Sequence, residues 1–80
     1  MMAHVIKATA FEREDGMQAI RVSPTQWVIR APIAGQTQFW NGSGWVVSSL
    51  IERPEGAEWP AQFVFSQGAA LAGLEILEAP

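Results

Sequence analysis

TQFWNGSGWVVS, residues 37–48, places four turn-forming residues between two short apolar runs, each with a Trp beside the turn. Asn-Gly between alternating strands is the strongest short-range signal for a β-hairpin. Because side chains alternate along a strand, such a hairpin has two faces. One face carries Gln38, Trp40, Trp45 and Val47, and the other carries Thr37, Phe39, Val46 and Ser48. Both faces hold large apolar groups, so the sequence leaves open which of them is uncovered.

The chain before this hairpin has the same strand-and-turn pattern. Alternation predicts strands near residues 4–12, 17–22 and 26–33, with turns at Asp15-Gly16 and at 23–25. Pro32 indicates an edge position or a bulge in the third strand, because proline cannot donate to a ladder. Ala34-Gly35 then turns into the hairpin, whose return strand runs to Ile51. We therefore expect a meander of about five to six antiparallel strands.

The last third of the chain has a different character. Two Pro, one Gly and three Glu predict a loop over residues 52–60, and residues 63–65 form a run too short to classify, although its composition favours a strand. Ser66 is a good N-cap for a helix formed by the Ala-rich segment that follows. We expect Gly73 to end this helix and release residues 74–78 as a last strand; the alternative continues the helix to Leu77. The predicted fold is one α+β domain over residues 1–80, a small antiparallel meander with one short C-terminal helix packed on it.

The charges of the chain are unevenly distributed. The net charge is −3, and the eight acidic residues fall in three groups at 12–15, 52–58 and 75–78. From Gly16 to Ile51 the only charged residues are Arg21 and Arg30. Interface cores are depleted in acids and Lys and enriched in aromatics and Arg, so this composition is typical of a binding surface. Strands that are simply well buried explain it equally well.

Few residues are suited to catalysis or to metal binding. His4 is the one His and lies near the N-terminus, and there is no Cys or Tyr. Glu52, Glu55 and Glu58 lack the oxygen-rich alternation of a calcium loop and indicate a solvated acidic loop. We expect no catalytic residue, no cofactor and no metal ion. Five scattered basic residues in an acidic chain argue against direct binding of nucleic acid.

The chain shows no membrane-span or signal-peptide pattern, so we expect a cytoplasmic protein with no membrane partner. Its four Trp residues are the main candidates for partner binding, because Trp is enriched at binding hot spots. Trp27 lies in the middle of a strand and is expected in the core, whereas Trp59 is either a plug over the core or an exposed anchor. The candidate partner-binding residues are Trp40, Trp45, Trp59, Arg30, Glu52, Glu55 and Glu58.

The general make-up of the chain resembles that of anti-CRISPR proteins, which phages and mobile elements carry to disarm host defences. The likeness rests on the twisted-meander pattern, on Phe65-Ser66 leading into an Ala-rich helix, and on the acidic loop at 52–58. Such proteins are commonly single compact domains without Cys or catalytic motifs. The resemblance covers no diagnostic motif, so no residue roles are carried over. It implies a protein that occupies a surface on a CRISPR effector subunit.

The leading hypothesis is therefore a non-enzymatic protein-binding module, an inhibitor of a bacterial CRISPR or other defence complex that acts by surface occlusion. A second hypothesis is a self-assembling or homodimeric phage or bacterial accessory protein, joined through an exposed sheet edge. A third is a small carbohydrate-binding module that uses exposed Trp.

Overall fold

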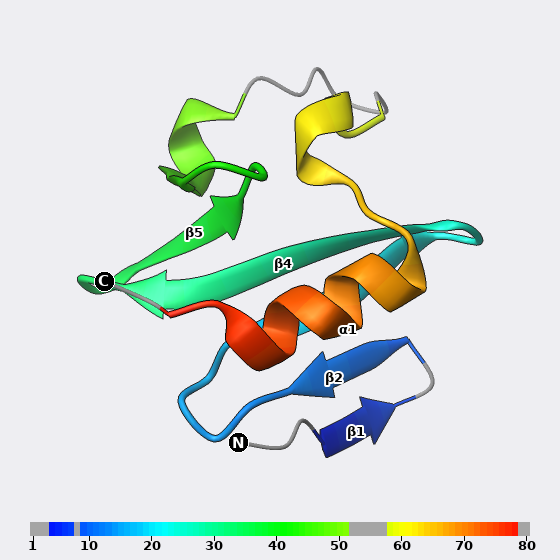
Figure 1. Cartoon of the computed structure of the whole chain (residues 1–80). Coiled ribbons are helices and arrows are strands. Elements are labelled where there is room, and N and C mark those ends of the chain that lie inside the picture. Colours follow the sequence, from blue (N-terminus) through cyan, green and yellow to red (C-terminus); the bar gives the residue numbers. More distant parts are fainter. Residues whose placement is uncertain (1–3, 8, 52–57, 79–80) are drawn as a thin grey trace.

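The computed structural model describes residues 4–7, 9–51 and 58–78. Within them the chain forms strands, two short 3-10 helices (η) and one α-helix (Figure 1). The strands are β1 (His4–Lys7), β2 (Ala10–Glu12), β3 (Gln18–Ser23), β4 (Gln26–Ile33), β5 (Gln36–Trp40) and β6 (Trp45–Val47). The helices are η1 (Ser48–Leu50), η2 (Ala61–Phe63) and α1 (Gln67–Ile76).

The described strands form one antiparallel sheet in the order β1-β2-β3-β4-β5-β6, which confirms the predicted α+β meander. Two predicted strands differ in extent. The expected first strand is instead two antiparallel strands, β1 and β2, in which Lys7 pairs with Ala10. The return strand of the central hairpin stops at Val47, and residues 48–50 form η1 instead of continuing the sheet.

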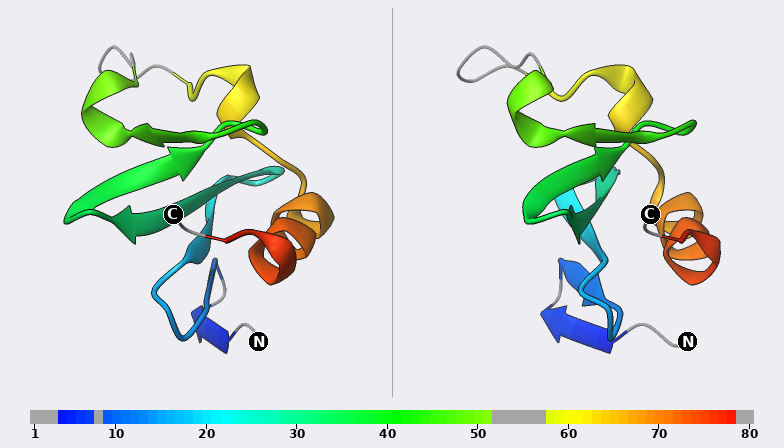
Figure 2. Two further views of the ribbon diagram at one scale, coloured as in Figure 1. Left: turned by 60° about the vertical axis from the view of Figure 1, so that its left-hand side comes forward. Right: turned by 90° about the vertical axis from the view of Figure 1, so that its left-hand side faces the viewer.

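β4 is the longest described strand, and different segments pair with the two halves of its β5-side edge. β5 pairs with its second half, from Arg30 to Ile33. At its first half, the N–H groups of Trp27 and Phe65 each donate to the other residue's carbonyl oxygen at 2.8 Å. The chain therefore passes β4 at Phe65 on its way from η2 to α1. Figure 2 shows η1 and η2 over the β5–β6 hairpin and α1 beside β4.

Pro32 lies inside the sheet rather than at its outer edge. It pairs with Thr37 of β5, but the pairing of β3 with β4 ends at Gln18 and Arg30. On that side Pro32 meets Gly16 instead, where an added Cβ would lie 3.2 Å from the Cγ of Pro32. Pro32 therefore has a strand neighbour on one side only, and its missing N–H leaves no ladder bond unmade.

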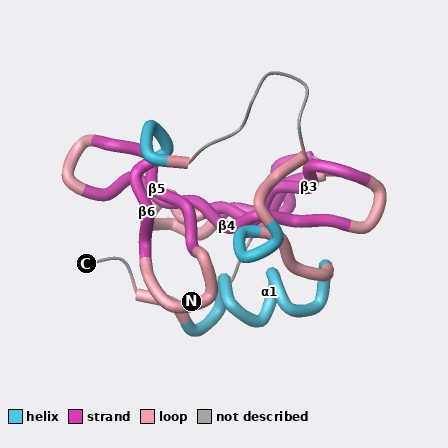
Figure 3. The backbone as a smooth tube through the Cα atoms, turned by 90° about the horizontal axis from the view of Figure 1, so that it is seen from above, coloured by secondary structure: helices cyan, strands magenta, loops and turns pink. Residues whose placement is uncertain are grey.

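Each face of the sheet has its own apolar cluster. Against α1, which runs along β4 (Figure 3), lie the side chains of Trp27, Ile29, Ala31 and Ile33, together with Met17 and Ala19. Ala70 and Leu74 are the fully buried residues that α1 contributes. A second, smaller cluster on the other face consists of Val28, Phe39 and Phe63. Alternation along β4 thus supplies apolar side chains to both clusters.

α1 begins as predicted and extends beyond the predicted end. The Ser66 hydroxyl accepts a hydrogen bond from the N–H of Ala69 at 3.2 Å and caps the helix. Gly73 does not end the helix, which continues to Ile76, so the expected last strand is wrong and the alternative is correct. An added Cβ on Gly73 would lie 2.9 Å from the Cδ1 of Ile29. Glycine is therefore needed at this position for close packing of the helix on the sheet, not as a terminator.

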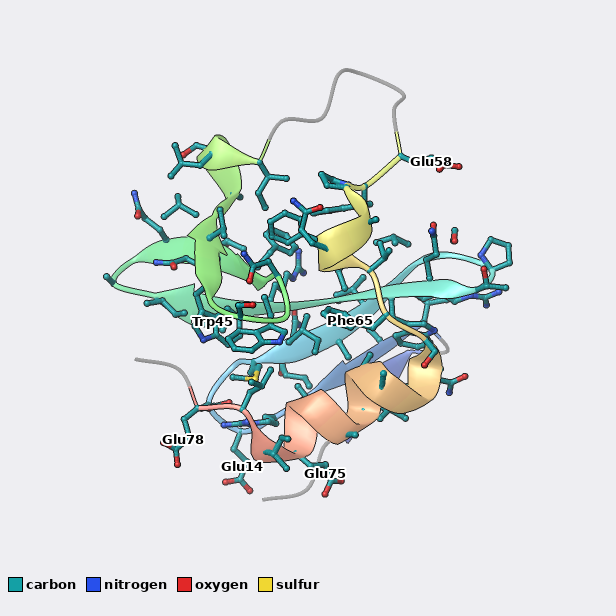
Figure 4. All side chains as sticks on the ribbon, turned by 45° about the horizontal axis from the view of Figure 1, so that its top comes forward. Glu14, Trp45, Glu58, Phe65, Glu75 and Glu78 are labelled. Carbon is teal, nitrogen blue, oxygen red and sulfur yellow. The ribbon has the colours of Figure 1, made fainter. Side chains whose placement is uncertain are left out.

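Arg13, in the turn between β2 and β3, binds the C-terminal end of α1. Its Nη1 donates to the carbonyl oxygens of Leu74 at 2.9 Å and Leu77 at 2.5 Å, and its Nη2 pairs with Asp15 at 2.6 Å. The last carbonyls of a helix have no intrahelical partner and form its negative end, so a cation is favourable there. Glu14, Glu75 and Glu78 add negative charge around the same end (Figure 4). The positive charge of Arg13 offsets the repulsion between these carboxylates and the negative end of α1. Its hydrogen bonds also join the helix to the turn between β2 and β3.

We expect the two helix glycines to respond differently to alanine. Gly68→Ala meets nothing within 4 Å, so it should raise the free energy of unfolding by about 0.5–1 kcal/mol. Gly73→Ala offers a similar gain in helix propensity, but its Cβ would press on the buried Ile29. It should therefore gain clearly less than Gly68→Ala, or lose stability, in urea unfolding. An equal or larger gain for Gly73→Ala would contradict this packing account.

We also expect Asp15 to make folding stability depend on acidity. Burial raises the pKa of the Asp15 carboxyl, but hydrogen bonds from the Met17 N–H and the Arg13 guanidinium outweigh it and leave the pKa lowered. A carboxyl with a lowered folded pKa stabilises the fold above its unfolded pKa, and this contribution is lost as the pH falls through the folded value. Urea unfolding should show the native protein more stable than Asp15→Asn near neutral pH, with a difference that shrinks below about pH 4. A difference that stays constant across this range would contradict the assignment.

Candidate protein-binding interface

The face of the sheet turned away from α1, here called the outer face, carries three open hollows in its described part. The first, the Arg30 hollow, has a volume of about 280 Å³ and is lined by Gly16, Gln18, Arg30, Ala31, Pro32 and Thr37. The other two share Ile51 and are called the apolar hollows. One, of about 330 Å³, is lined by Phe39, Ser48, Ile51 and Trp59. The other, of about 450 Å³, is lined by Asn41, Val46, Leu50, Ile51, Pro60, Gln62 and Phe63.

The central hairpin places its side chains on the two faces as the alternation predicts. Thr37, Phe39, Val46 and Ser48, which share one predicted face, all line hollows of the outer face. Trp40 and Trp45, on the other predicted face, pack against the helix-side cluster. The structure therefore shows which face of the central hairpin is turned toward α1. α1 and the cluster beneath it cover the side of the Trp pair, and the Phe39 side receives partial cover from η2 and the residues before it.

The apolar hollows lie beside side chains that the second cluster leaves partly open. Trp59 packs on Phe39 with ring centroids 4.8 Å apart and on Phe63 with centroids 6.3 Å apart. Ile51 and Val46 are half-buried at the margin of this aromatic group. Leu50, at the end of η1, is 73% exposed. The end of the outer face near β6 thus offers apolar surface around a group of packed aromatic rings.

The other end of the outer face is polar and organised by a chain of hydrogen bonds across three strands. Arg30 on β4 donates from Nε to the Oε1 of Gln18 on β3 at 2.8 Å. Gln18 in turn donates from Nε2 to the Oε1 of Glu12 on β2 at 2.7 Å. The three residues lie directly opposite one another in the sheet, so strand register fixes their order. This chain holds the guanidinium of Arg30 at the wall of its hollow.

The two ends of the outer face adjoin each other at Arg30 and Phe39. These residues lie opposite each other on β4 and β5. Side chains directly opposite on adjacent antiparallel strands have Cβ atoms about 5 Å apart. Phe39 also lines one of the apolar hollows, so a charged group and an apolar depression are neighbours on one surface.

The predicted partner-binding residues are distributed over both faces. Trp40 and Trp45 are half-buried, with ring centroids 5.4 Å apart, and contribute to the helix-side cluster. Figure 4 shows Trp45 between the hairpin and the end of α1. Arg30 and Trp59 belong to the outer face. Of the two alternatives for Trp59, the structure shows the plug, because its ring packs on Phe39.

Of the three glutamates of the predicted acidic loop, Glu58 alone belongs to the described residues. Glu58 is exposed and lies at the opposite end of the molecule from Glu14, Glu75 and Glu78 (Figure 4). Glu52 and Glu55 lie outside the described residues. Within the part of the chain that is described, no group of three His, Asp or Glu side chains is arranged to hold a metal ion. No described helix is long and apolar enough to cross a membrane.

Several residues of the outer face are not apparent from the sequence as candidates. Gln18 and Thr37 are uncharged and resemble ordinary surface residues of a strand. Leu50 and Ile51 follow the hairpin and are expected to continue its return strand, whereas η1 turns them over the outer face. The one available signal is strand alternation, which groups Thr37 with Phe39 and Gln18 with Ile20.

No protein-family model, curated protein or solved structure matches this chain.

The position of the Trp pair predicts a structural role that can be measured. Trp45→Ala should lower the free energy of unfolding by about 1.5–3 kcal/mol, less than a fully buried Trp, because the ring is half-buried against the helix-side cluster. Leu50→Ala, at an exposed position, should change it by less than about 0.5 kcal/mol. Urea unfolding of both variants provides the comparison. Equal effects would mean that Trp45 is not part of the packed core.

Proposed function

We propose that this protein is a protein-binding module that acts by occupying a surface of its partner through the outer face. The observation that carries the proposal is the pair of apolar hollows that meet at Ile51. Phe39 and Trp59 line one of them, and Phe63 and the 73% exposed Leu50 line the other. Exposed contiguous apolar surface that is rimmed by polar residues marks interaction sites in small proteins. Binding energy concentrates where aromatic and aliphatic anchors fill such depressions.

The same proposal in its finer form is an inhibitor of a bacterial CRISPR or related defence complex. Its support is the general resemblance to anti-CRISPR proteins, together with a docking face on a small single-sheet scaffold. A module that occludes a surface needs rigid placement of its contact residues, which reduces the entropy lost on binding. Strand register places Arg30 and Phe39 in this way.

Self-association is the second candidate. Its supporting observation is that β6 ends the sheet order and that Leu50 lies directly after it at the same margin. A free edge strand can pair with a second copy. A carbohydrate-binding module has less support, because the Oδ1 of Asn41 already accepts hydrogen bonds from the N–H groups of Ser43 and Gly44.

Two exposed hydrophobic residues on different sides of the molecule provide a matched test. Leu50 is 73% exposed beside the apolar hollows, and Ile76 is 78% exposed at the end of α1. We expect Leu50→Lys to weaken partner binding at least tenfold by placing a charge in an apolar contact, with little loss of stability. Ile76→Lys should leave binding unchanged. The measurement is quantitative capture from bacterial lysates, including strains with CRISPR effectors, followed by affinity measurement on the recovered protein.

The outcomes separate the candidate functions. Loss of the same specific protein with Leu50→Lys but not with Ile76→Lys supports a docking role for the outer face. Equal recovery by both variants would overturn it. Light scattering identifies self-association if the native chain is a dimer and Leu50→Lys a monomer. Restored phage plating on a CRISPR-immune strain, abolished by Leu50→Lys alone, would support the defence-inhibitor form.

A further inference from the structure

We infer that the Arg30 hollow is a carboxylate-binding site, and that it takes an Asp or Glu side chain of a protein partner whose neighbouring apolar residue enters the apolar hollows. This inference rests on the proposed function and specifies the chemistry of the partner. Its basis is the juxtaposition of a positioned guanidinium with an apolar depression on one face.

Arg30 is held in a way that leaves donors for a ligand. Its Nε donates to Gln18 at 2.8 Å, and within the described residues no hydrogen bond or ion pair joins either Nη atom to another group. Neither Nη belongs to the buried polar atoms that lack a partner, so both reach solvent. A guanidinium presents its N–H groups as a planar fork that matches a carboxylate, and holding Nε in place reduces the rotamer freedom lost on binding.

The charges around the hollow favour an anion. Among the described residues no acid lines it, and Arg30 is one of two charged residues between Gly16 and Ile51. Asp15 is paired with Arg13, and Glu12, which keeps its charge, lies two strands away from Arg30 and accepts a hydrogen bond from Gln18. Thr37 adds a hydroxyl to the lining that can donate to a second carboxylate oxygen.

A side-chain carboxylate fits the lining better than a chain terminus does. Terminal carboxylates are typically captured by successive free backbone N–H groups. Among the lining residues, Gln18, Arg30 and Thr37 have polar side chains, Pro32 has no N–H, and the N–H of Gly16 already donates to the carbonyl oxygen of Arg13. The adjoining apolar hollow also requires that the partner chain continue past the carboxylate. In an extended segment, residues two apart lie on one side about 7 Å apart, which suits an acidic residue followed two positions later by an apolar one.

The test uses two tripeptides that differ only in charge, acetyl-Glu-Ala-Phe-amide and acetyl-Gln-Ala-Phe-amide, with NMR detection on the full chain. We expect the Glu peptide to bind with a dissociation constant of about 1–10 mM and the Gln peptide at least about fivefold more weakly. Arg30→Gln should abolish this preference. Arg21→Gln removes the same charge from an exposed position bonded to Ser23 and Pro24, and should retain the preference. Thr37→Val should reduce it about twofold to fivefold.

Each result decides the inference. In the native protein, the Glu peptide should shift the NMR signal of the Arg30 Nε–H more than that of the Arg21 Nε–H. This result supports the carboxylate site even if Arg30→Gln fails to fold. Equal binding of the two peptides, equal loss with Arg21→Gln, or no saturable binding up to about 50 mM would overturn it. A protein partner lost with Leu50→Lys but indifferent to Arg30→Gln would overturn the carboxylate site and leave the proposed function standing.

Discussion

The backbone pair between Trp27 and Phe65 is the constraint on which the rest of the structure depends. Both N–H groups are satisfied at 2.8 Å, and the pair occupies the half of β4 that β5 does not reach. It fixes the point at which the chain passes from η2 to α1. Without it, β4 would expose unpaired backbone in the middle of a sheet, which costs as much as a lost hydrogen bond for each buried group. The backbone pair at Phe65 therefore positions both α1, which follows it, and the segment with Trp59, which precedes it.

This crossing divides the apolar residues of a small chain between two faces. The helix-side cluster is the larger, and it is closed by the close approach of Gly73 to Ile29 and by the binding of Arg13 to the last carbonyls of α1. What remains for the other face is a cluster around Val28, Phe39 and Phe63. Leu50, one of three large hydrophobic residues that the described structure leaves exposed, lines a hollow together with Phe63 of this cluster. The outer face is thus incompletely covered because most of the buried apolar residues belong to the helix-side cluster.

Most of the elements that the sequence predicts correctly are specified by local signals, such as turn glycines and strand alternation. Gly16, Gly35 and Gly42 adopt positive φ in turns that were recognisable as hairpin signals, and Gln26–Ile33 is β4 with the same bounds. The misread role of Gly73 and the unrecognised role of Arg13 both depend on tertiary contacts. Gly73 resembles a helix terminator because its role depends on Ile29, more than forty positions away, and Arg13 gives no sequence sign that it binds the end of α1. The position of Arg30 on one face follows from alternation, but the Gln18 bond that orients it depends on register between strands.

The absence of acidic residues from Gly16 to Ile51 has two explanations in the sequence, burial and interface composition, and burial applies to only some of these side chains. Trp27, Ile29 and Ala31 are buried, and a carboxylate in their place would be desolvated without a partner. Arg30 alternates with them along β4, and it lines a hollow of the outer face together with Thr37 of β5. Burial does not require the alternate positions to lack acids, since β2 carries Glu12 at the corresponding place. At the outward positions of β4 and β5, burial accounts for the lack of acids at Val28 and Phe39 but not at Arg30 and Thr37, where an acid would repel a carboxylate-bearing partner.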